Sequence, residues 1–217
     1  MSRLTTLLSA SLAAAGAVGA AVAVGAGLDG FGARDDEVDA RLPGDELHGP
    51  GAIVRTRAVA IDAPPAEVWP WLVQLGWGRA GWYSIDALER LLGAARSVDS
   101  TGTASWRSVD EIVPAHQDLA VGDTIPLKEG VGFEVVALAA QEHLVGVFDA
   151  GGLRMVWTFV LVDLGDSTRL LVRTAFGGSS AAVRAARRLL LDPGHAVMEV
   201  VQLRRIKQRA ESRVEEW

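Results

Sequence analysis

The stretch Ala60-Ile-Asp-Ala-Pro-Pro-Ala-Glu-Val-Trp-Pro-Trp-Leu72 decides the fold, because it passes directly from a strand into a helix. Residues 53–61 alternate in polarity and are rich in β-branched side chains, which is typical of a strand. The pair Pro64–Pro65 then indicates a helix start, since proline is tolerated in a first helical turn. The helix predicted over residues 66–75 contains Pro70, which should bend it or leave one carbonyl unpaired.

Downstream of this unit, short strand-like segments follow one another closely. The predicted strands are residues 123–127, 133–140, 143–149, 155–163 and 168–176, and the predicted helices are residues 85–92, 181–191 and 194–216. The separators between strands are turn-like, whereas a parallel return needs a crossover of about a dozen residues or more. The sequence therefore predicts an α+β fold, with one curved antiparallel sheet, two short helices and a long C-terminal helix lying across it.

Composition excludes several classes of function. The 217 residues carry 21 Lys and Arg against 27 Asp and Glu, a net charge of -6, which argues against a nucleic-acid partner because such a partner needs a basic surface. The absence of cysteine excludes disulfides, thiolate nucleophiles and zinc–thiolate sites. The four histidines are scattered and form no H-E-x-x-H pair, so we expect neither a metal site nor a cofactor.

The N-terminal residues 1–28 are hydrophobic, and residues 4–28 form a run of 25 residues without a charge. A helix of this length would span ~37 Å, more than the ~30 Å hydrocarbon core of a bilayer. We therefore expect a single-pass membrane anchor. One alternative is a cleaved secretory signal, for which Arg3 supplies a positive start, although signals usually have an apolar region of only ~7–15 residues. A buried or peripheral helix is the other alternative.

Residues 29–51 are acidic and punctuated by glycine and proline. They predict a linker between the membrane and a folded domain over residues 52–217, with at most a short helical turn near residues 35–42.

Several motifs along the domain carry a family resemblance. The stretch 60–72 resembles the opening strand and helix of the START/birch-allergen/polyketide-cyclase (SRPBCC) superfamily. Val73-Gln-Leu-Gly76, Arg79-Ala-Gly-Trp-Tyr-Ser84 and Asp192-Pro-Gly-His195 are similar to a membrane-anchored, actinobacterial-type subgroup, and the resemblance covers about residues 35–213. It implies a helix-grip fold in which the concave face of the sheet and the terminal helix enclose a pocket, typically for a lipid or polyketide-like molecule. It implies no particular activity.

The predicted strands supply suitable walls for such a pocket. Met155, Trp157, Phe159 and Leu161 share one face of their strand, and Phe133, Val135 and Ala137 share one face of theirs. An apolar pocket with a few polar groups is the default hypothesis for a binding site, whereas inward-facing apolar side chains are more often simply the core. The candidate ligand-binding residues are Arg79, Trp82, Tyr83, His116, Phe133, Phe148, Trp157, Phe159, His195 and Met198.

Two groups of side chains could support catalysis instead. Tyr83 could donate a proton that Asp86 relays, and His195 and Glu199 stand four residues apart on one helix face. One structural alternative is that Arg79 pairs with a nearby carboxylate such as Asp86 or Glu89. The other is that His195 serves the helix start and Glu199 a surface or helix-to-sheet ion pair. We favour a membrane-tethered protein that binds a small hydrophobic ligand without catalysis. The alternatives are a cyclase or dehydratase-type enzyme, and an interaction protein whose pocket is filled by side chains.

Overall fold

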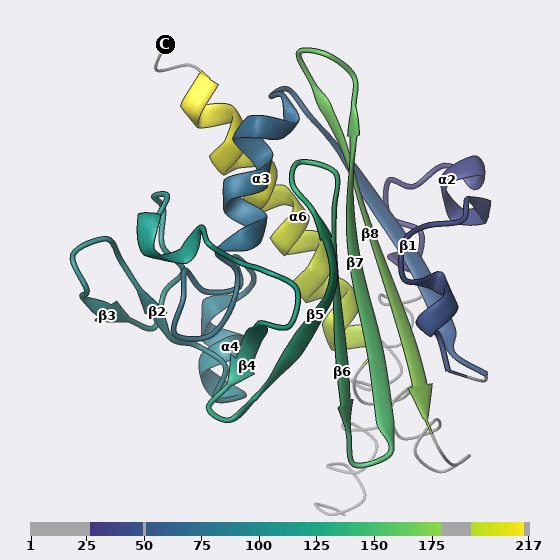
Figure 1. Cartoon of the computed structure of the whole chain (residues 1–217), viewed down its shortest axis with the longest axis horizontal. Helices are drawn as coiled ribbons and strands as arrows, with labels where there is room; N and C mark the ends of the chain where they lie inside the picture. Colours follow the sequence, from purple (N-terminus) through teal and green to yellow (C-terminus); the bar gives the residue numbers. More distant parts are fainter. Residues whose placement is uncertain (1–26, 50, 179–191, 215–217) are drawn as a thin grey trace, which may run out of the picture.

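The computed structural model describes residues 27–49, 51–178 and 192–214. Its centre is a six-stranded sheet in the order β1-β8-β7-β6-β5-β4, in which every neighbouring pair is antiparallel (Figure 1). The strands are β1 (Ile53–Ile61), β4 (Thr124–Lys128), β5 (Val131–Ala139), β6 (His143–Ala150), β7 (Leu153–Asp163) and β8 (Thr168–Gly178). The predicted α+β class and antiparallel sheet are confirmed.

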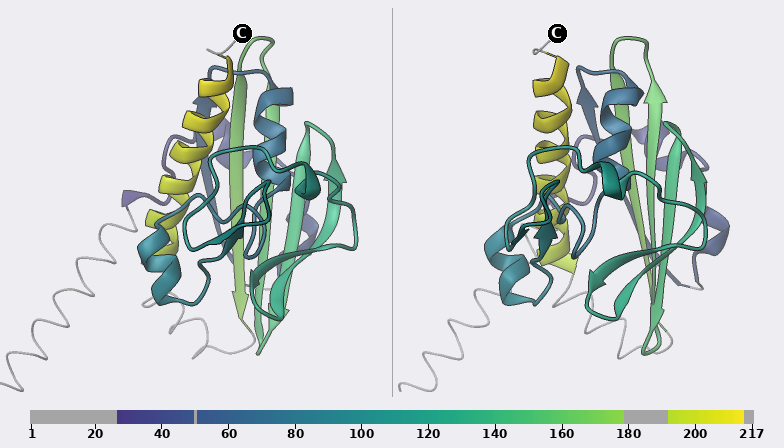
Figure 2. Two further views of the ribbon diagram at one scale, coloured as in Figure 1. Left: turned by 90° about the vertical axis from the view of Figure 1, so that its left-hand side faces the viewer. Right: turned by 60° about the vertical axis from the view of Figure 1, so that its left-hand side comes forward.

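Helices and loops cover the inner face of this sheet. The long helix α6 (Asp192–Val214) lies across it beside α3 (Pro65–Val73), which is the helix-grip arrangement (Figure 2). The chain between α3 and β4 forms a further side of the core that the sheet and helices enclose. It contains α4 (Asp86–Leu91), the hairpin of β2 (Ser97–Val98) and β3 (Ala104–Ser105), and the 3-10 turn η2 (Pro114–His116). The helix predicted over residues 181–191 lies outside the described residues.

Alternation along the strands sends one set of side chains inward. Trp157 and Phe159 of β7 and Phe133 of β5 belong to the main core beneath α6. One expectation for β5 is wrong, because a bulge between Val135 and Ala137 shifts the register against β6. The extra residue turns Ala137 to the outer face, where it packs in a second cluster with Val145.

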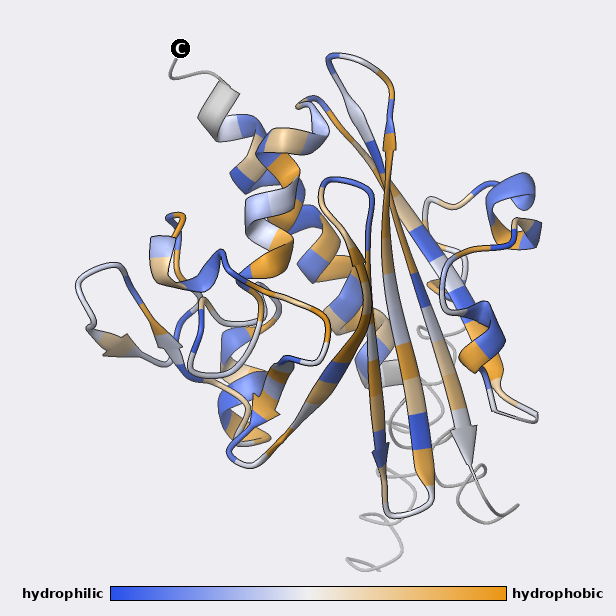
Figure 3. Ribbon diagram, in the orientation of Figure 1, coloured by the Kyte–Doolittle hydropathy of each residue, from blue (hydrophilic) through white to orange (hydrophobic). Residues whose placement is uncertain are grey.

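Residues 27–49, here called the strap, pack on the outer face of the sheet over β1, β8 and β7. The strap contains α2 (Asp35–Asp39), which is largely hydrophilic in Figure 3, and the 3-10 turn η1 (Asp45–Leu47). It begins at the free edge of β1, where the Ala58 N–H donates to the Phe31 carbonyl at 2.9 Å. Figure 2 places α2 on the side of the sheet opposite α6. The described part of the acidic segment is therefore packed structure and not the free spacer that we expected.

Two arginines of β8 explain why an acidic segment packs there. Arg173 donates to the carbonyls of Glu37, Val38 and Ala40 and to the Asp45 carboxylate, at 2.7–2.9 Å. Arg169 forms a two-pronged ion pair with Glu37, with both N–O distances 2.7 Å. These charge-assisted bonds satisfy guanidinium groups that the strap itself buries.

The predicted membrane anchor lies almost wholly outside the described residues. Within residues 27–49, 51–178 and 192–214, no helix is both long and apolar enough to cross a bilayer.

Candidate functional site

An aromatic cluster fills the space between the sheet and α6. Trp157 of β7 lies at its centre, stacked on Trp82 with ring centroids 5.5 Å apart and tilted against Phe159 at 4.9 Å. Phe133 of β5 packs against Trp157 at 5.4 Å, and Phe148 of β6 extends the cluster at 5.9 Å from Phe133. Five of the residues predicted from sequence to contact a ligand therefore come together. They come from the strands β5, β6 and β7 and from the loop that carries Trp82.

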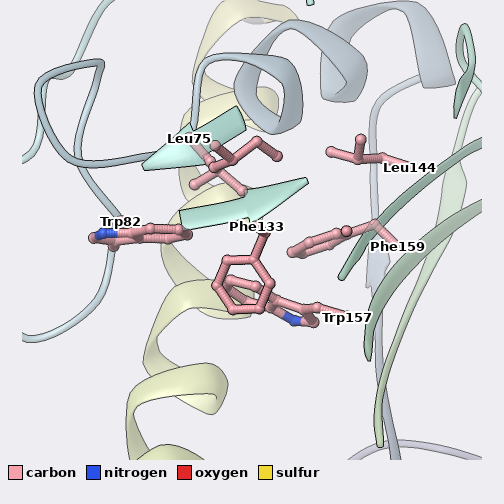
Figure 4. Close-up of a pocket in the computed structure, with 8 residues that line it drawn as sticks. Leu75, Trp82, Phe133, Leu144, Trp157 and Phe159 are labelled. Atoms are coloured by element: carbon pink, nitrogen blue, oxygen red, sulfur yellow. The ribbon is translucent and has the colours of Figure 1, made fainter. Parts of the chain in front are cut away.

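One apolar hollow remains inside this cluster. Figure 4 shows Trp82, Phe133, Trp157 and Phe159 around it, with Leu75 and Leu144 above. Its volume is about 10 Å³, which is at the lower limit for a single water molecule. Gly146 forms part of its wall, and a Cβ at this position would lie 3.1 Å from the Cβ of Phe133. The aromatic side chains thus occupy nearly all of the space that a ligand would need.

A buried ion pair borders the cluster on the side of α6. The Arg57 guanidinium of β1 donates to one carboxylate oxygen of Glu199, and the Trp157 indole N–H donates to the other at 3.1 Å. Burial raises the pKa of Glu199 to about 7, while Arg57 and the two hydrogen bonds act in the opposite direction. Arg57 also donates from Nε to the Leu28 carbonyl at 2.8 Å. The same side chain therefore joins strap, sheet and helix.

His195 lies one turn before Glu199 on α6, with its ring edge-on to Phe176 at 5.0 Å and to Trp157 at 6.2 Å. Burial, with a smaller contribution from the Arg57 charge, lowers the pKa of His195 to about 3. The imidazole is therefore neutral near pH 7. Glu199 is held by Arg57 and Trp157, so these interactions, and not His195, fix its orientation.

Tyr83 lies in a buried polar network outside the hollow. Gln74, the residue after α3, donates to its hydroxyl. The Gln74 amide oxygen accepts the Val113 N–H at 2.9 Å and the Gln117 amide at 3.1 Å. Burial is the main cause of a raised Tyr83 pKa. The backbone of Tyr83 has a φ of 54°, a conformation that is uncommon outside glycine, so the network holds the loop in a strained turn.

Arg79 and His116 also lie away from the hollow. Arg79 donates to the Val73 carbonyl at 2.8 Å and to the His116 carbonyl at 2.7 Å, and so joins the end of α3 to η2. Neither Asp86 nor Glu89 is its partner, contrary to the structural alternative considered from sequence. Burial and the Arg79 charge lower the pKa of His116.

Asp86 connects α4 to α6, and Met198 connects α6 to the loop just before α4. Asp86 accepts from the backbone N–H and the hydroxyl of Ser108, at 3.1 and 3.2 Å, and from Arg205 at 3.3 Å. The Met198 carbonyl accepts the Ser84 hydroxyl at 3.1 Å. Tyr83 reaches Asp86 only through Ser108, whose hydroxyl accepts the Tyr83 backbone N–H at 2.9 Å. The phenol and the carboxylate therefore do not form the proton relay considered from sequence.

Sequence reasoning missed Arg57 and Gln74. An arginine that alternates with apolar residues on a strand looks solvent-facing, and its burial depends on Glu199, 142 residues away. Gln74 looks like an ordinary residue near a helix end. Its complete burial could have been suggested only by its place between Val73 and Leu75.

A second hollow, open to solvent and about 470 Å³ in volume, lies on the outer face over β4, β5 and β6. It is largely polar, and Arg154 within it is paired with Asp149 at 2.8 Å. Among the described residues, no cluster of three His, Asp or Glu side chains is arranged as metal ligands.

Comparison with known proteins finds similar architectures only. No protein-family model matches the chain, and no curated protein matches it. Protein MLL2253 from Mesorhizobium loti matches at 21% identity and a TM-score of 0.39, over 73% of this chain and 98% of that one. CalU16 from Micromonospora echinospora matches at 16% identity and a TM-score of 0.36, over 74% and 86%.

DynU16, a protein of the dynemicin biosynthetic locus, matches at 13% identity and a TM-score of 0.41, over 73% of this chain and 49% of that one. At these identities and scores, neither activity nor ligand carries over to this chain.

Proposed function

We propose that this chain, as a member of the SRPBCC superfamily, binds a small hydrophobic molecule between the inner face of the sheet and α6, without converting it chemically. The observation that carries the proposal is the aromatic cluster, in which Trp82, Phe133 and Trp157 surround an apolar hollow. Aromatic faces with few polar groups suit a flat or chain-like apolar molecule. The motifs quoted from residues 60–84 and 192–195 support the superfamily assignment.

Binding requires the cluster to open, because the hollow of about 10 Å³ admits no organic molecule as it stands. Trp82 is the side chain best placed to move, since it comes from a loop whereas its partners come from strands. The loop before it contains Gly76, Gly78 and Gly81, all with positive φ, a conformation that glycine adopts at little cost. A ligand would take the place of the Trp82 ring against Trp157.

The geometry lends the catalytic alternative no support at Tyr83 and Asp86. The Tyr83 hydroxyl is bound by Gln74, and burial raises its pKa, so it is a poor proton donor at neutral pH. Asp86 is occupied by Ser108 and Arg205. These contacts favour structural roles for both residues.

The test is a titration of the full chain, held in an amphipol, with the apolar fluorophore N-phenyl-1-naphthylamine. Wild type is compared with Gly146→Val, which places a side chain in the wall of the hollow, and with Val147→Ile, which enlarges the neighbouring residue on the outer face. All three proteins contain residues 1–28, so any fluorophore that binds to that segment contributes equally to the three titrations. We expect saturable uptake in wild type and Val147→Ile, and at least tenfold weaker uptake in Gly146→Val.

A second function follows if the cluster never opens. The near-absence of free volume would then favour an interaction protein with a filled core. Equal uptake in all three proteins, or none above the amphipol background, would count against ligand binding and for this second function.

We also propose that residues 4–28 tether the domain to a membrane as a single span. The support is the length of the uncharged run. Cell fractionation of the full chain tests it: retention in the membrane fraction after an alkaline carbonate wash, at full mass, is expected. A shortened chain in the soluble fraction would instead indicate a cleaved signal.

A further inference from the structure

A small exposed surface on α4 and the β2–β3 hairpin combines apolar and cationic side chains. Leu91 and Leu92 at the end of α4 are 81% and 60% exposed, and Trp106 just after β3 is 40% exposed. The Arg90 and Arg107 guanidinium groups lie over the Trp106 ring, at 5.3 and 4.9 Å from its centroid. We call Arg90, Leu91, Leu92, Arg96, Trp106 and Arg107 the basic aromatic patch.

The arginines of this patch are held by aromatic rings and not by carboxylates of the described residues. In the described part of the chain, none of Arg90, Arg96 and Arg107 forms an ion pair; Arg96 lies over the Trp77 ring at 5.3 Å. Nearby carboxylates bind other groups: Asp86 binds Arg205, Asp99 binds the backbone N–H groups of its own turn, and Glu111 binds the Ser100 N–H. The patch is therefore a locally positive surface on a chain whose net charge is -6.

We propose that the basic aromatic patch docks the domain onto an anionic lipid bilayer surface. Tryptophan and leucine partition into the interfacial region of a bilayer, and arginine places its cation among the lipid phosphates while its stem covers apolar surface. Anionic headgroups attract the three arginines and repel the acidic remainder of the domain, so the charge pattern selects one orientation.

The position of the patch suits a domain held beside a membrane. Arg204 of α6 lies over the ring of Phe31 at the start of the strap, and its neighbour Arg205 pairs with Asp86 at the start of α4. The start of the strap, which follows the predicted anchor, and the helix α4, which carries part of the patch, therefore contact the same turn of α6. Docking of the patch does not depend on the inner aromatic cluster. The docking proposal can therefore fail while the ligand-binding proposal stands, and the ligand-binding proposal can fail while the docking proposal stands.

The test measures the depth of a fluorophore on the full chain in lipid vesicles. Because the chain has no cysteine, Leu92→Cys gives a single site for the environment-sensitive dye NBD. Leu164→Cys is the matched control: it is also exposed, at 57%, and lies in the β7–β8 turn, at the opposite end of the molecule from α4 (Figure 1). Vesicles contain phosphatidylcholine alone or with phosphatidylglycerol, and lipids that carry a spin label near the headgroup serve as quenchers.

We expect NBD at position 92 to shift to the blue and be quenched in vesicles with phosphatidylglycerol, and NBD at position 164 to do neither. Replacing Arg90, Arg96 and Arg107 by glutamine should reduce the docked population by about fivefold per arginine, and high salt should have the same effect. Equal signals at positions 92 and 164 would overturn the proposal. So would a blue shift that depends on protein density and not on anionic lipid, because it would indicate that a second copy covers the patch.

Discussion

Arg57 on β1 and Glu199 on α6 form a buried ion pair that joins the edge strand of the sheet to the C-terminal helix. Glu199 also accepts the Trp157 indole N–H, and Arg57 also binds the strap at the Leu28 carbonyl. The aromatic cluster and the N-terminal segment are thus connected through two side chains. A buried pair of this kind is costly to break from one side only, because the remaining charge has no partner.

Arg57→Met should therefore be more damaging than the loss of the whole pair. We expect the single substitution to lower the free energy of unfolding by about 3–5 kcal/mol, and the double variant Arg57→Met with Glu199→Leu to recover most of that loss. Urea unfolding of wild type, both single variants and the double variant measures the coupling. Additive effects in this cycle would show that the pair contributes no interaction energy.

The response of stability to pH should depend on His195. Its pKa is lowered from 6.5 to about 3 in the folded protein, so the unfolded chain binds the proton more readily between these values. Acidification from pH 6.5 towards 3 therefore destabilises the fold through this residue. Glu199, with its pKa raised to about 7, has the opposite effect over the upper part of the range.

The variant His195→Phe removes the first effect and keeps the second. Its urea midpoint should fall less on acidification than that of wild type, and the difference should grow steadily below pH 6.5. Parallel pH profiles for the two proteins would mean that His195 is not buried in neutral form.

Truncating the aromatic cluster should create a usable cavity. Phe133→Ala removes a ring that packs on Trp82, Phe148 and Trp157, and we expect a loss of stability of about 3–5 kcal/mol. The enlarged hollow should bind benzene, detected as a rise in melting temperature with benzene concentration. No benzene-dependent shift would show that the neighbouring rings collapse into the space.

The strap should detach when Arg173 is replaced. Arg173→Met removes the donors to Glu37, Val38, Ala40 and Asp45, and leaves these acceptors against an apolar side chain. Trypsin should then cut at the exposed Arg34 or Arg41 at least tenfold faster than in wild type. The control is Arg107→Gln. Arg107 lies far from the strap in sequence and contacts Trp106, so this variant should leave the cleavage rate unchanged.

Tyr83→Phe should affect stability but not ligand uptake. Removing the hydroxyl leaves a donor of the Gln74 amide without its acceptor, which we expect to cost about 1–3 kcal/mol. The hollow is lined by other residues, so N-phenyl-1-naphthylamine should bind as in wild type. A tenfold loss of uptake in a folded Tyr83→Phe protein would place Tyr83 in the binding site after all.

Local patterns predicted the sheet, because strand alternation and short turns are local properties of the sequence. The aromatic wall of Trp157 and Phe159 followed from the same alternation. The bulge at Val135 to Ala137 did not, since a single extra residue leaves no signal in the pattern. Nor did the strap, because acidic residues such as Glu37 pack only through arginines more than a hundred positions away.

In the candidate site, too, local sequence patterns predicted some features and not others. The inward direction of Phe133, Trp157 and Phe159 could be predicted from period-two spacing on their strands, and the structure packs these rings together. The polar contacts of Arg79, Tyr83 and Asp86 could not be predicted, because each includes a partner in a loop or helix distant in sequence: the His116 carbonyl, Ser108 and Arg205.

Ligand binding is best tested by native mass spectrometry of the full chain, isolated from its own host membranes, followed by organic extraction. We expect one apolar molecule bound per chain in wild type and in Val147→Ile, and none in Gly146→Val. An empty wild-type protein that also takes up no apolar probe would contradict ligand binding. The aromatic cluster would then be a closed core.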